Sequence, residues 1–273
     1  YSVISIIAGH GVLAFRDPHA FRPLILGKRQ NGDKIEYIVS SESVAVSTLG
    51  FEIVSDIEPG EAIFIDLDRN VHREICGPAK PTPCIFEHVY LARPDSTMDE
   101  VNVYKARLRM GTKLAKQIKK SKLKIDVVVP VPETSRTSAV PLAYELGVKL
   151  REGFVKNRYI GRTFIMPGQK VRKKSIKFKL NPIELEFRNK RVLLVDDSIV
   201  RGNTMKRIVE MLREIGAKKI YVASCAPALV SPCVYGVDMP TRQEFVAFDK
   251  KIKEIEEDLG VDKLFYQNVD DLV

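Results

Sequence analysis

The sequence lacks tryptophan, has only four cysteines among its 273 residues, and does not begin with methionine. The cysteines are too few and too irregularly spaced for the disulfide framework of a small secreted protein. No apolar stretch has the length of about 20 residues that a membrane span needs. The first residues are apolar but lack the charged leader and the small-residue cleavage site of a signal peptide. These absences predict a cytoplasmic protein, and the start at Tyr1 indicates a fragment of a longer chain.

The chain is basic, with a formal net charge of +9 and an isoelectric point near 9.3. It shows no helix-turn-helix pattern and no aromatic RNA-binding motif, so we expect no nucleic-acid partner. Lysines and arginines are spread along the chain, apart from one cluster at Lys170–Lys179. Two explanations stay open: a lysine-rich solvated surface, and a local site for a small polyanionic substrate.

Two textures divide the sequence near Pro83. Before it, short apolar runs alternate with turn signals, which predicts antiparallel β-structure. After it, the pattern alternates between strands and helices, which predicts an α/β domain with a parallel sheet. Ser96 and Asp99 can form a capping box that starts the first helix. Strands are predicted at Ile125–Val129, Arg191–Val195 and in the run KIYVASCA, and helices at 137–147, 204–215 and within 241–259.

The segment RVLLVDDSIVRGNT, Arg191–Thr204, carries the chemistry. Its apolar strand ends in Asp196 and Asp197, at the strand end where open α/β sheets bind ligands. Two adjacent carboxylates can accept hydrogen bonds from a pair of ribose hydroxyls or hold Mg²⁺. The following loop leads into a helix N-terminus, which favours a phosphate group, and Gly202 lets the backbone approach closely. The segment therefore predicts a 5-phosphoribose site.

This segment resembles the phosphoribosyl pyrophosphate (PRPP) signature of type I phosphoribosyltransferases. Further segments, including FEHVYLARPDS, VPVPETS, KNRYIGRTFI and VYGVDMPTR, resemble glutamine phosphoribosylpyrophosphate amidotransferase, the amidophosphoribosyltransferase family. The upstream RDPHAFRPL and SSESVAVSTLGF resemble the later part of that family's glutaminase domain. The resemblance implies an α+β glutaminase remnant of the N-terminal nucleophile hydrolase type over 1–83. An α/β type I phosphoribosyltransferase domain with a parallel sheet follows over 84–273.

The resemblance also implies roles for individual residues. The PRPP loop corresponds to Asp196–Thr204, that is Asp196, Asp197, Ser198, Ile199, Val200, Arg201, Gly202, Asn203 and Thr204. Glu133 and Ser135 belong to the pyrophosphate loop, and Thr134 joins Asp196 and Asp197 as the Mg²⁺ positions. The loop that closes over PRPP corresponds to Lys156–Leu180. Its candidate pyrophosphate contacts are Lys156, Arg158, Tyr159 and Arg162, and its basic cluster is Lys170, Arg172, Lys173, Lys174 and Lys177.

The implied reaction forms 5-phosphoribosylamine from PRPP and ammonia, with release of pyrophosphate, as the first committed step of purine biosynthesis. Cationic groups would stabilise the leaving pyrophosphate, and no residue of this chain would act as a nucleophile. In the intact protein the ammonia would come from glutamine. The family further suggests a homotetramer that purine nucleotides inhibit, without a membrane partner.

The sequence departs from the family at its start, and its cysteines raise a separate question. The family's glutaminase uses an N-terminal cysteine as nucleophile, whereas residue 1 here is tyrosine, so we expect the catalytic cysteine upstream. One branch of the family binds a [4Fe–4S] cluster, and Cys84 and Cys233 correspond to two of its four ligands. The other two would form a Cys-x-x-Cys pair beyond Val273. Buried free thiols are the alternative explanation for both cysteines.

Two other functions stay open. A regulatory protein could bind PRPP through the same loop without catalysis, although such regulators usually add a DNA-binding helix-turn-helix. A salvage phosphoribosyltransferase could act on a nucleobase, but the β-rich segment before Pro83 argues against it.

Overall fold

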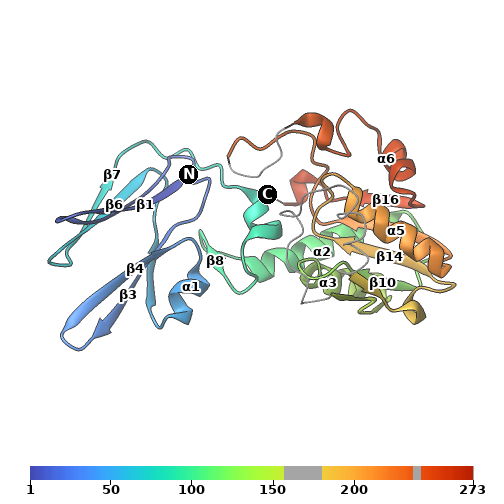
Figure 1. Cartoon of the computed structure of the whole chain (residues 1–273), viewed down its shortest axis with the longest axis horizontal. Coiled ribbons are helices and arrows are strands. Elements are labelled where there is room, and N and C mark those ends of the chain that lie inside the picture. The colour runs from blue at the N-terminus through green and yellow to red at the C-terminus, as the bar shows by residue number, and fades with distance from the viewer. Residues whose placement is uncertain (157–179, 236–240, 273) are drawn as a thin grey trace, which may run out of the picture. The chain divides into compact units, whose positions relative to one another are not determined.

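A computed structural model describes residues 1–156, 180–235 and 241–272. By internal contacts the chain forms two compact units, Tyr1–Ala106 and Arg107–Val273 (Figure 1). Residues 84–106 thus pack with the first unit, although the sequence analysis grouped them with the second domain. The functional boundary at Cys84 stays a prediction.

The first unit consists of antiparallel sheets, as the alternating apolar runs predict. One sheet has the strand order β1-β2-β6-β7, and the other has the order β4-β3-β5. Their small core contains Leu24, Leu26 and Ile63. The strands are β1 (Ser2–Ile7), β2 (Gly11–Arg16), β3 (Ile25–Asn31), β4 (Lys34–Ser40), β5 (Glu52–Asp56), β6 (Glu61–Asp66) and β7 (Val71–Ile75), with helix α1 (Ser43–Thr48) before β5.

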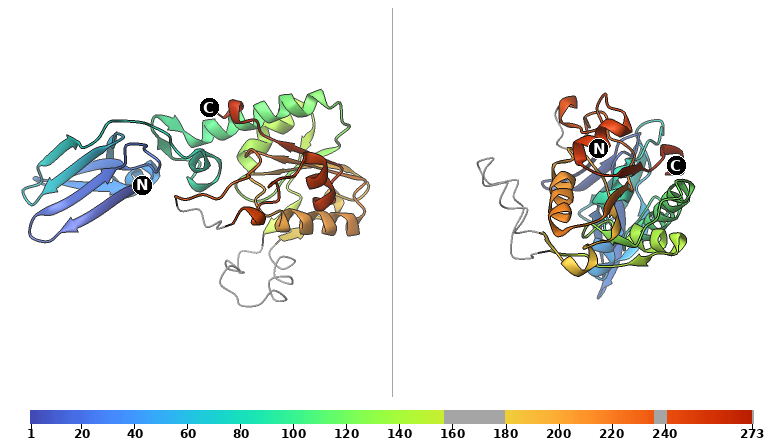
Figure 2. Two further views of the ribbon diagram at one scale, coloured as in Figure 1. Left: turned by 90° about the horizontal axis from the view of Figure 1, so that it is seen from above. Right: turned by 90° about the vertical axis from the view of Figure 1, so that its right-hand side faces the viewer.

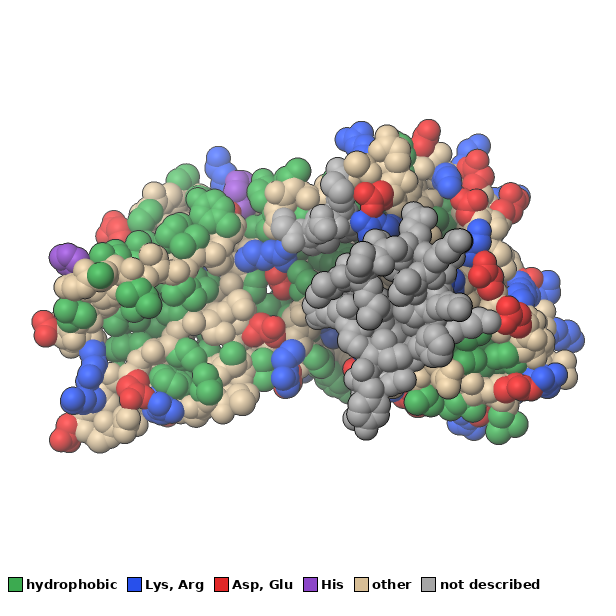
Figure 3. All heavy atoms as spheres, in the orientation of Figure 1, with side chains coloured by type: hydrophobic (Ala, Val, Ile, Leu, Met, Phe, Trp, Pro, Cys, Tyr) green, Lys and Arg blue, Asp and Glu red, His purple; other side chains and the backbone are tan. Residues whose placement is uncertain are grey.

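Apolar side chains gather on the surface of this first unit (Figure 3). Strand β1 lies at the edge of its sheet, and its Ile4 and Ile6 are 49% and 81% exposed. An exposed apolar edge strand offers unpaired backbone groups to other strands.

The prediction that Ser96 and Asp99 form a capping box is wrong, because the first long helix begins only at Val103. Residues 97–102 form a short hairpin of β8 (Thr97–Met98) and β9 (Val101–Asn102), and α2 runs over Val103–Lys120. The Ser96 hydroxyl donates to Glu42 Oε2 at 2.8 Å, and the Asp99 carboxylate accepts two hydrogen bonds from the buried Arg16. Both side chains are thus engaged by distant partners. Asn102 caps the helix instead, because its Oδ1 accepts the Lys105 N–H at 3.0 Å.

The second unit contains a five-stranded parallel sheet, which confirms the predicted α/β class. Its order is β11-β10-β14-β15-β16, and every neighbouring pair is parallel. The predicted strands appear as β10 (Val127–Pro130), β14 (Arg191–Asp196) and β15 (Lys219–Ser224). The sequence analysis missed the edge strands β11 (Lys149–Leu150) and β16 (Lys263–Tyr266).

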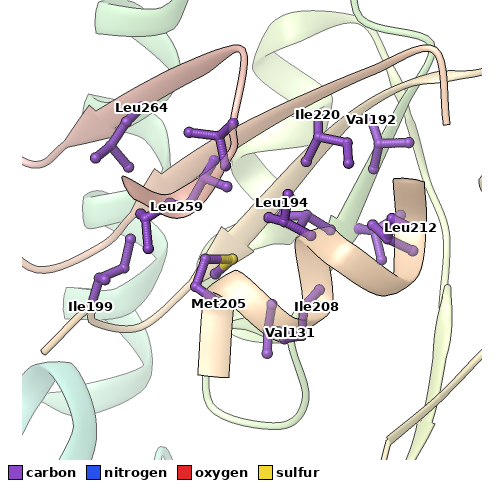
Figure 4. Packing of buried hydrophobic residues seen from close by; sticks show 14 of the residues in the cluster. Val131, Val192, Leu194, Ile199, Met205, Ile208, Leu212, Ile220, Leu259 and Leu264 are labelled. Atoms are coloured by element: carbon purple, nitrogen blue, oxygen red, sulfur yellow. The ribbon is translucent and has the colours of Figure 1, made fainter. Parts of the chain in front are cut away.

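Helices cover both faces of this sheet (Figure 2). Residues of α2 and α3 (Arg136–Leu146) pack on one face with Leu193 and Val195. Residues of α5 (Asn203–Ile215) and α6 (Ile252–Leu259) pack on the other face with Val192 and Leu194 (Figure 4). Strand β14 is therefore buried on both sides, which explains its unbroken apolar run.

Two short strands outside this sheet flank the residues that the structure does not describe. β12 (Phe154–Lys156) and β13 (Leu180–Pro182) pair antiparallel, with Lys156 opposite Leu180. Within the described residues no helix is long and apolar enough to span a membrane. Short helical turns lie at Glu87–Leu91, Glu184–Glu186, Arg242–Glu244 and Val269–Asp271.

Candidate active site

Two loops meet at the carboxyl edge of the parallel sheet. One follows β14, which ends at Asp196, and begins with Asp197; the other follows the adjacent strand β10 and contains Thr134. The N–H of Val131 donates to the Val195 carbonyl at 2.8 Å, which extends the pairing to the start of both loops. The Thr134 side chain lies close enough to the Asp197 carboxylate to lower its pKa. The structure thus brings together the three positions that the sequence analysis connected with Mg²⁺.

The acidic pair is held in a setting that disfavours two bare charges. Burial raises the pKa of Asp196 well above its ordinary value, and the neighbouring charge of Asp197 raises it further. Burial also raises the pKa of Asp197, although hydrogen bonds from Ser198 and Thr134 and the positive charge of Arg107 oppose this. A ligand that brings hydroxyl donors or a cation would therefore relieve a cost that the free protein carries.

The loop after the acidic pair presents main-chain donors at the N-terminus of α5. Gly202 is the N-cap residue, with φ +73°, and no side chain caps the helix there. The first N–H groups of a helix lack intrahelical partners and favour an anion. A methyl group at Gly202 would lie 2.9 Å from Leu259 Cδ2 and 3.1 Å from Val246 Cγ2. The backbone conformation therefore favours glycine here, and any larger residue would also have to displace the side chains of Leu259 and Val246.

Two of the predicted ligand residues, Ile199 and Ser135, can contribute only through their main chain, whereas three others have exposed side chains. Ile199 is buried in the hydrophobic core of the sheet. The Ser135 hydroxyl is buried and already donates its proton to the Val131 carbonyl at 2.6 Å. Asn203 and Thr204 are exposed at the start of α5, and Glu133 is exposed in the β10 loop. Their side chains are accessible to a ligand.

The candidate pyrophosphate contacts lie mostly beyond what the structure describes. Lys156 is exposed at the end of β12. Arg158, Tyr159, Arg162 and the basic cluster between Lys170 and Lys177 lie outside the described residues. Their roles stay predictions.

Sequence reasoning missed the residues behind the acidic pair. Arg107 of α2 is 3% exposed, and its carbonyl accepts a hydrogen bond from the buried Ser138 hydroxyl at 2.9 Å. The N–H of Cys225 donates to the Asp196 carbonyl at 2.9 Å. No spacing or motif connects these positions, so only the fold could reveal them. An accurate prediction of burial could have found them, because Arg107, Ser138 and Cys225 would then appear as buried polar residues among apolar ones.

Cys225 should be inert to alkylation in the folded protein. Burial raises the pKa of its thiol to about 12, and the charges of Asp196 and Asp197 act in the same direction. At pH 8 the thiolate fraction is then about 10⁻⁴, and the thiolate is the reactive species. Cys76 is exposed and should react first with iodoacetamide. Peptide mass spectrometry after timed labelling checks this; equal labelling of Cys225 and Cys76 in native protein would contradict it.

The two candidate cluster ligands lie in different units. Cys84 and Cys233 are both half-buried free thiols. Within the described residues no group of three or more histidine, cysteine, aspartate or glutamate side chains could hold a metal. Two cysteines cannot complete a four-cysteine cluster, so the residues of this chain do not form an iron–sulfur site by themselves.

Comparison with known proteins agrees with this geometry. The family model of the phosphoribosyl transferase domain matches residues 97–259. An amidophosphoribosyltransferase of Pseudomonas aeruginosa is 55% identical over 276 residues, covering 100% of this chain and 55% of the relative. That of Escherichia coli is 52% identical over 277 residues, with the same coverage.

A solved structure extends the likeness to three dimensions. It is described as glutamine PRPP amidotransferase from B. subtilis complexed with ADP and GMP. The TM-score is 0.84 at 38% identity, covering 96% of this chain and 56% of that one. The chain therefore spans about half the length of the relatives it matches. It belongs to the phosphoribosyltransferase family, and its whole length is similar to amidophosphoribosyltransferases.

Proposed function

We propose that the chain is the phosphoribosyl-transfer part of an amidophosphoribosyltransferase, which forms 5-phosphoribosylamine from PRPP and ammonia. One observation carries the proposal. A carboxylate pair and a helix N-terminus without a side-chain cap lie at one edge of a parallel sheet, joined by residues 198–202. Such an arrangement suits the ribose hydroxyls and the 5-phosphate of one ligand. The similarity to named amidophosphoribosyltransferases over the whole chain supports the choice of ammonia as acceptor.

A magnesium ion that enters with PRPP suits the donor set. Magnesium is usually bound through one or two carboxylates together with substrate phosphates, rather than in a cage of protein ligands. Asp196, Asp197 and Thr134 offer two carboxylates and a hydroxyl, and the raised pKa of both carboxyl groups indicates a place that a cation would stabilise. Bound there, the ion would neutralise charge that develops on the departing pyrophosphate.

The protein's own residues would orient PRPP and stabilise charge. The carboxylates of Asp196 and Asp197 would accept hydrogen bonds from the ribose hydroxyls, and the N–H groups of the loop up to Thr204 would hold the 5-phosphate. The β10 loop with Glu133, Thr134 and Ser135 would face the pyrophosphate. Ammonia then forms a bond to C1 of the ribose as the bond to pyrophosphate breaks, and the ammonium formed loses a proton. No protein nucleophile is needed.

The segment that starts at Lys156 would complete the pyrophosphate end. The antiparallel pairing of β12 with β13 supports this, because it brings the two ends of residues 157–179 together. Lys156, Arg158, Tyr159 and Arg162 would then contact the leaving group. Exclusion of water during the reaction would protect the activated sugar from hydrolysis.

Residues 1–83 would be the non-catalytic remainder of a glutaminase domain of the N-terminal nucleophile hydrolase type. The likeness to a glutamine PRPP amidotransferase across 96% of the chain supports this assignment. In the intact protein the ammonia would then come from glutamine. That relative was solved in complex with ADP and GMP, which supports purine nucleotides as ligands here; that they inhibit the protein follows from the family resemblance alone. A cytoplasmic homotetramer and an iron–sulfur cluster completed by further cysteines follow from the family resemblance alone.

The test is pyrophosphate release from PRPP with magnesium and different acceptors. We expect release with ammonium salts at pH above 8, where free ammonia is more abundant, and none with hypoxanthine or orotate. Release with a nucleobase would favour a salvage enzyme. Binding of PRPP without release under any condition would favour a regulatory PRPP-binding protein.

A further inference from the structure

The loop that would hold the 5-phosphate is tied to a distant segment of the chain. Arg201 is the only cation between Asp196 and Asn203. Its guanidinium forms an ion pair with Glu244, the last residue of the turn Arg242–Glu244. The other carboxylate oxygen, Glu244 Oε1, accepts the Thr241 hydroxyl at 3.3 Å. The Glu244 carboxylate thus contacts Thr241 through one oxygen and Arg201 through the other.

A backbone bond and a packing contact attach the same segment to the loop. The Val246 N–H donates to the Val200 carbonyl at 2.8 Å. The backbone of Gly202 lies against the side chains of Val246 and Leu259, which an added methyl group would have to displace. Phe245 is buried at 3% exposure. Val200, Arg201 and Gly202 thus all contact the same group of residues, 244–246 and Leu259.

This attachment matters because the loop would bind its ligand mainly through main-chain N–H groups. Such groups bind an anion well only when their directions are fixed beforehand. The loop has no side-chain cap at the start of α5, so no side chain holds the first N–H groups of the helix there. Arg201 is 43% exposed in its side chain, and an unpaired long cation would sample many rotamers. The Glu244 pair removes that freedom at the centre of the loop.

We propose that Glu244 is a positioning residue for PRPP: through Arg201 it orders the loop Ser198–Thr204 before the 5-phosphate binds. This rests on the proposed function of the loop. Glu244 does not contact the ligand, and it sets affinity rather than the rate of the chemical step.

The experiment compares Glu244→Ala with Glu244→Gln in the full chain, by calorimetric titration with PRPP and magnesium. An exposed ion pair contributes up to about 1 kcal/mol, so its loss should weaken binding about fivefold. We expect that weakening in Glu244→Ala, a turnover with ammonia within about twofold of wild type, and faster hydrogen exchange of amides 198–204. Glu244→Gln keeps an acceptor for Arg201, so its affinity should stay within about twofold.

Matched controls separate this role from a general loss of stability. Glu184→Ala removes the partner of Arg188 in an exposed ion pair elsewhere in the second unit, and should leave binding unchanged. Thr241→Val keeps the Arg201 pair but removes the hydroxyl beside Glu244, and should weaken binding by about twofold. Unchanged or tighter binding in Glu244→Ala overturns the proposal. Failure of the wild-type chain to bind PRPP would instead overturn the proposed function.

Discussion

Replacing Asp196 with asparagine should make the protein more stable and much less active. The carboxylate is held beside that of Asp197 in a setting where burial raises the pKa of both groups. Asparagine has nearly the same shape without the charge, so it removes a repulsion that the free protein carries. The same change removes a charged acceptor for the ribose. A hydrogen bond to a charged group contributes about 1.5–3 kcal/mol, which predicts a loss of about 10- to 100-fold in kcat/KM for PRPP.

The stability gain has a characteristic pH dependence. Because the folded state raises the pKa of Asp196, it disfavours ionisation, and that penalty grows as the pH rises above the ordinary value of 3.8. The variant's advantage should therefore be largest near neutral pH, shrink as the pH falls toward 4, and vanish only below about pH 3, where the carboxyl group is mostly protonated in both states. Thermal unfolding without PRPP or magnesium, measured between pH 4 and pH 8, checks this. A lower melting temperature of the variant at pH 7 would contradict the burial penalty.

Gly202→Ala should damage both the fold and the phosphate loop. At φ +73° an alanine costs about 1–2 kcal/mol relative to glycine. Its methyl group would also press on Leu259 and Val246, and such overpacking typically costs about 1–3 kcal/mol. We expect a total destabilisation of about 2–5 kcal/mol and at least tenfold weaker PRPP binding, measured by denaturant unfolding and titration.

Gly216→Ala is the matched control at the other end of the same helix. Gly216 also has a positive φ, +91°, but nothing lies within 4 Å of an added methyl group. It should show only the conformational cost, with PRPP binding unchanged. The double variant Gly202→Ala with Val246→Ala should regain part of the packing cost but none of the conformational cost. If Gly202→Ala and Gly216→Ala have the same effect on binding, the close contact with Val246 has no role in shaping the loop.

The local features of the candidate site were predictable because they lie within short stretches of sequence. An apolar run of strand length, two acidic residues and a glycine before an amphipathic helix occur within Arg191–Ile215. Each is set by interactions between near neighbours: backbone conformation at Gly202, helix periodicity, and burial of β14 on both faces. The parallel sheet also followed, since strands that alternate with helices connect most simply by crossovers.

Local patterns failed where a side chain is engaged by a distant residue. Ser96 and Asp99 have the spacing of a capping box, yet their side chains bind Glu42 and Arg16, and Asn102 caps the helix instead. Edge strands β11 and β16 are only two and four residues long. Such short strands show too little periodicity to be recognised in the sequence. They become strands by pairing with β10 and β15 in the folded sheet.

The sequence by itself determined the carboxylate pair at the end of an apolar strand, the loop that leads from it into a helix, and the α/β class of the domain that holds them. Only the tertiary structure decided what surrounds that loop: Thr134 against Asp197, Arg107 and Cys225 behind the pair, and Glu244 with Val246 beside Arg201 and Gly202. The physical reason is the range of the interactions. Helix and strand preferences act within a few residues, whereas these contacts depend on the order of strands in the sheet and on which helix covers each face.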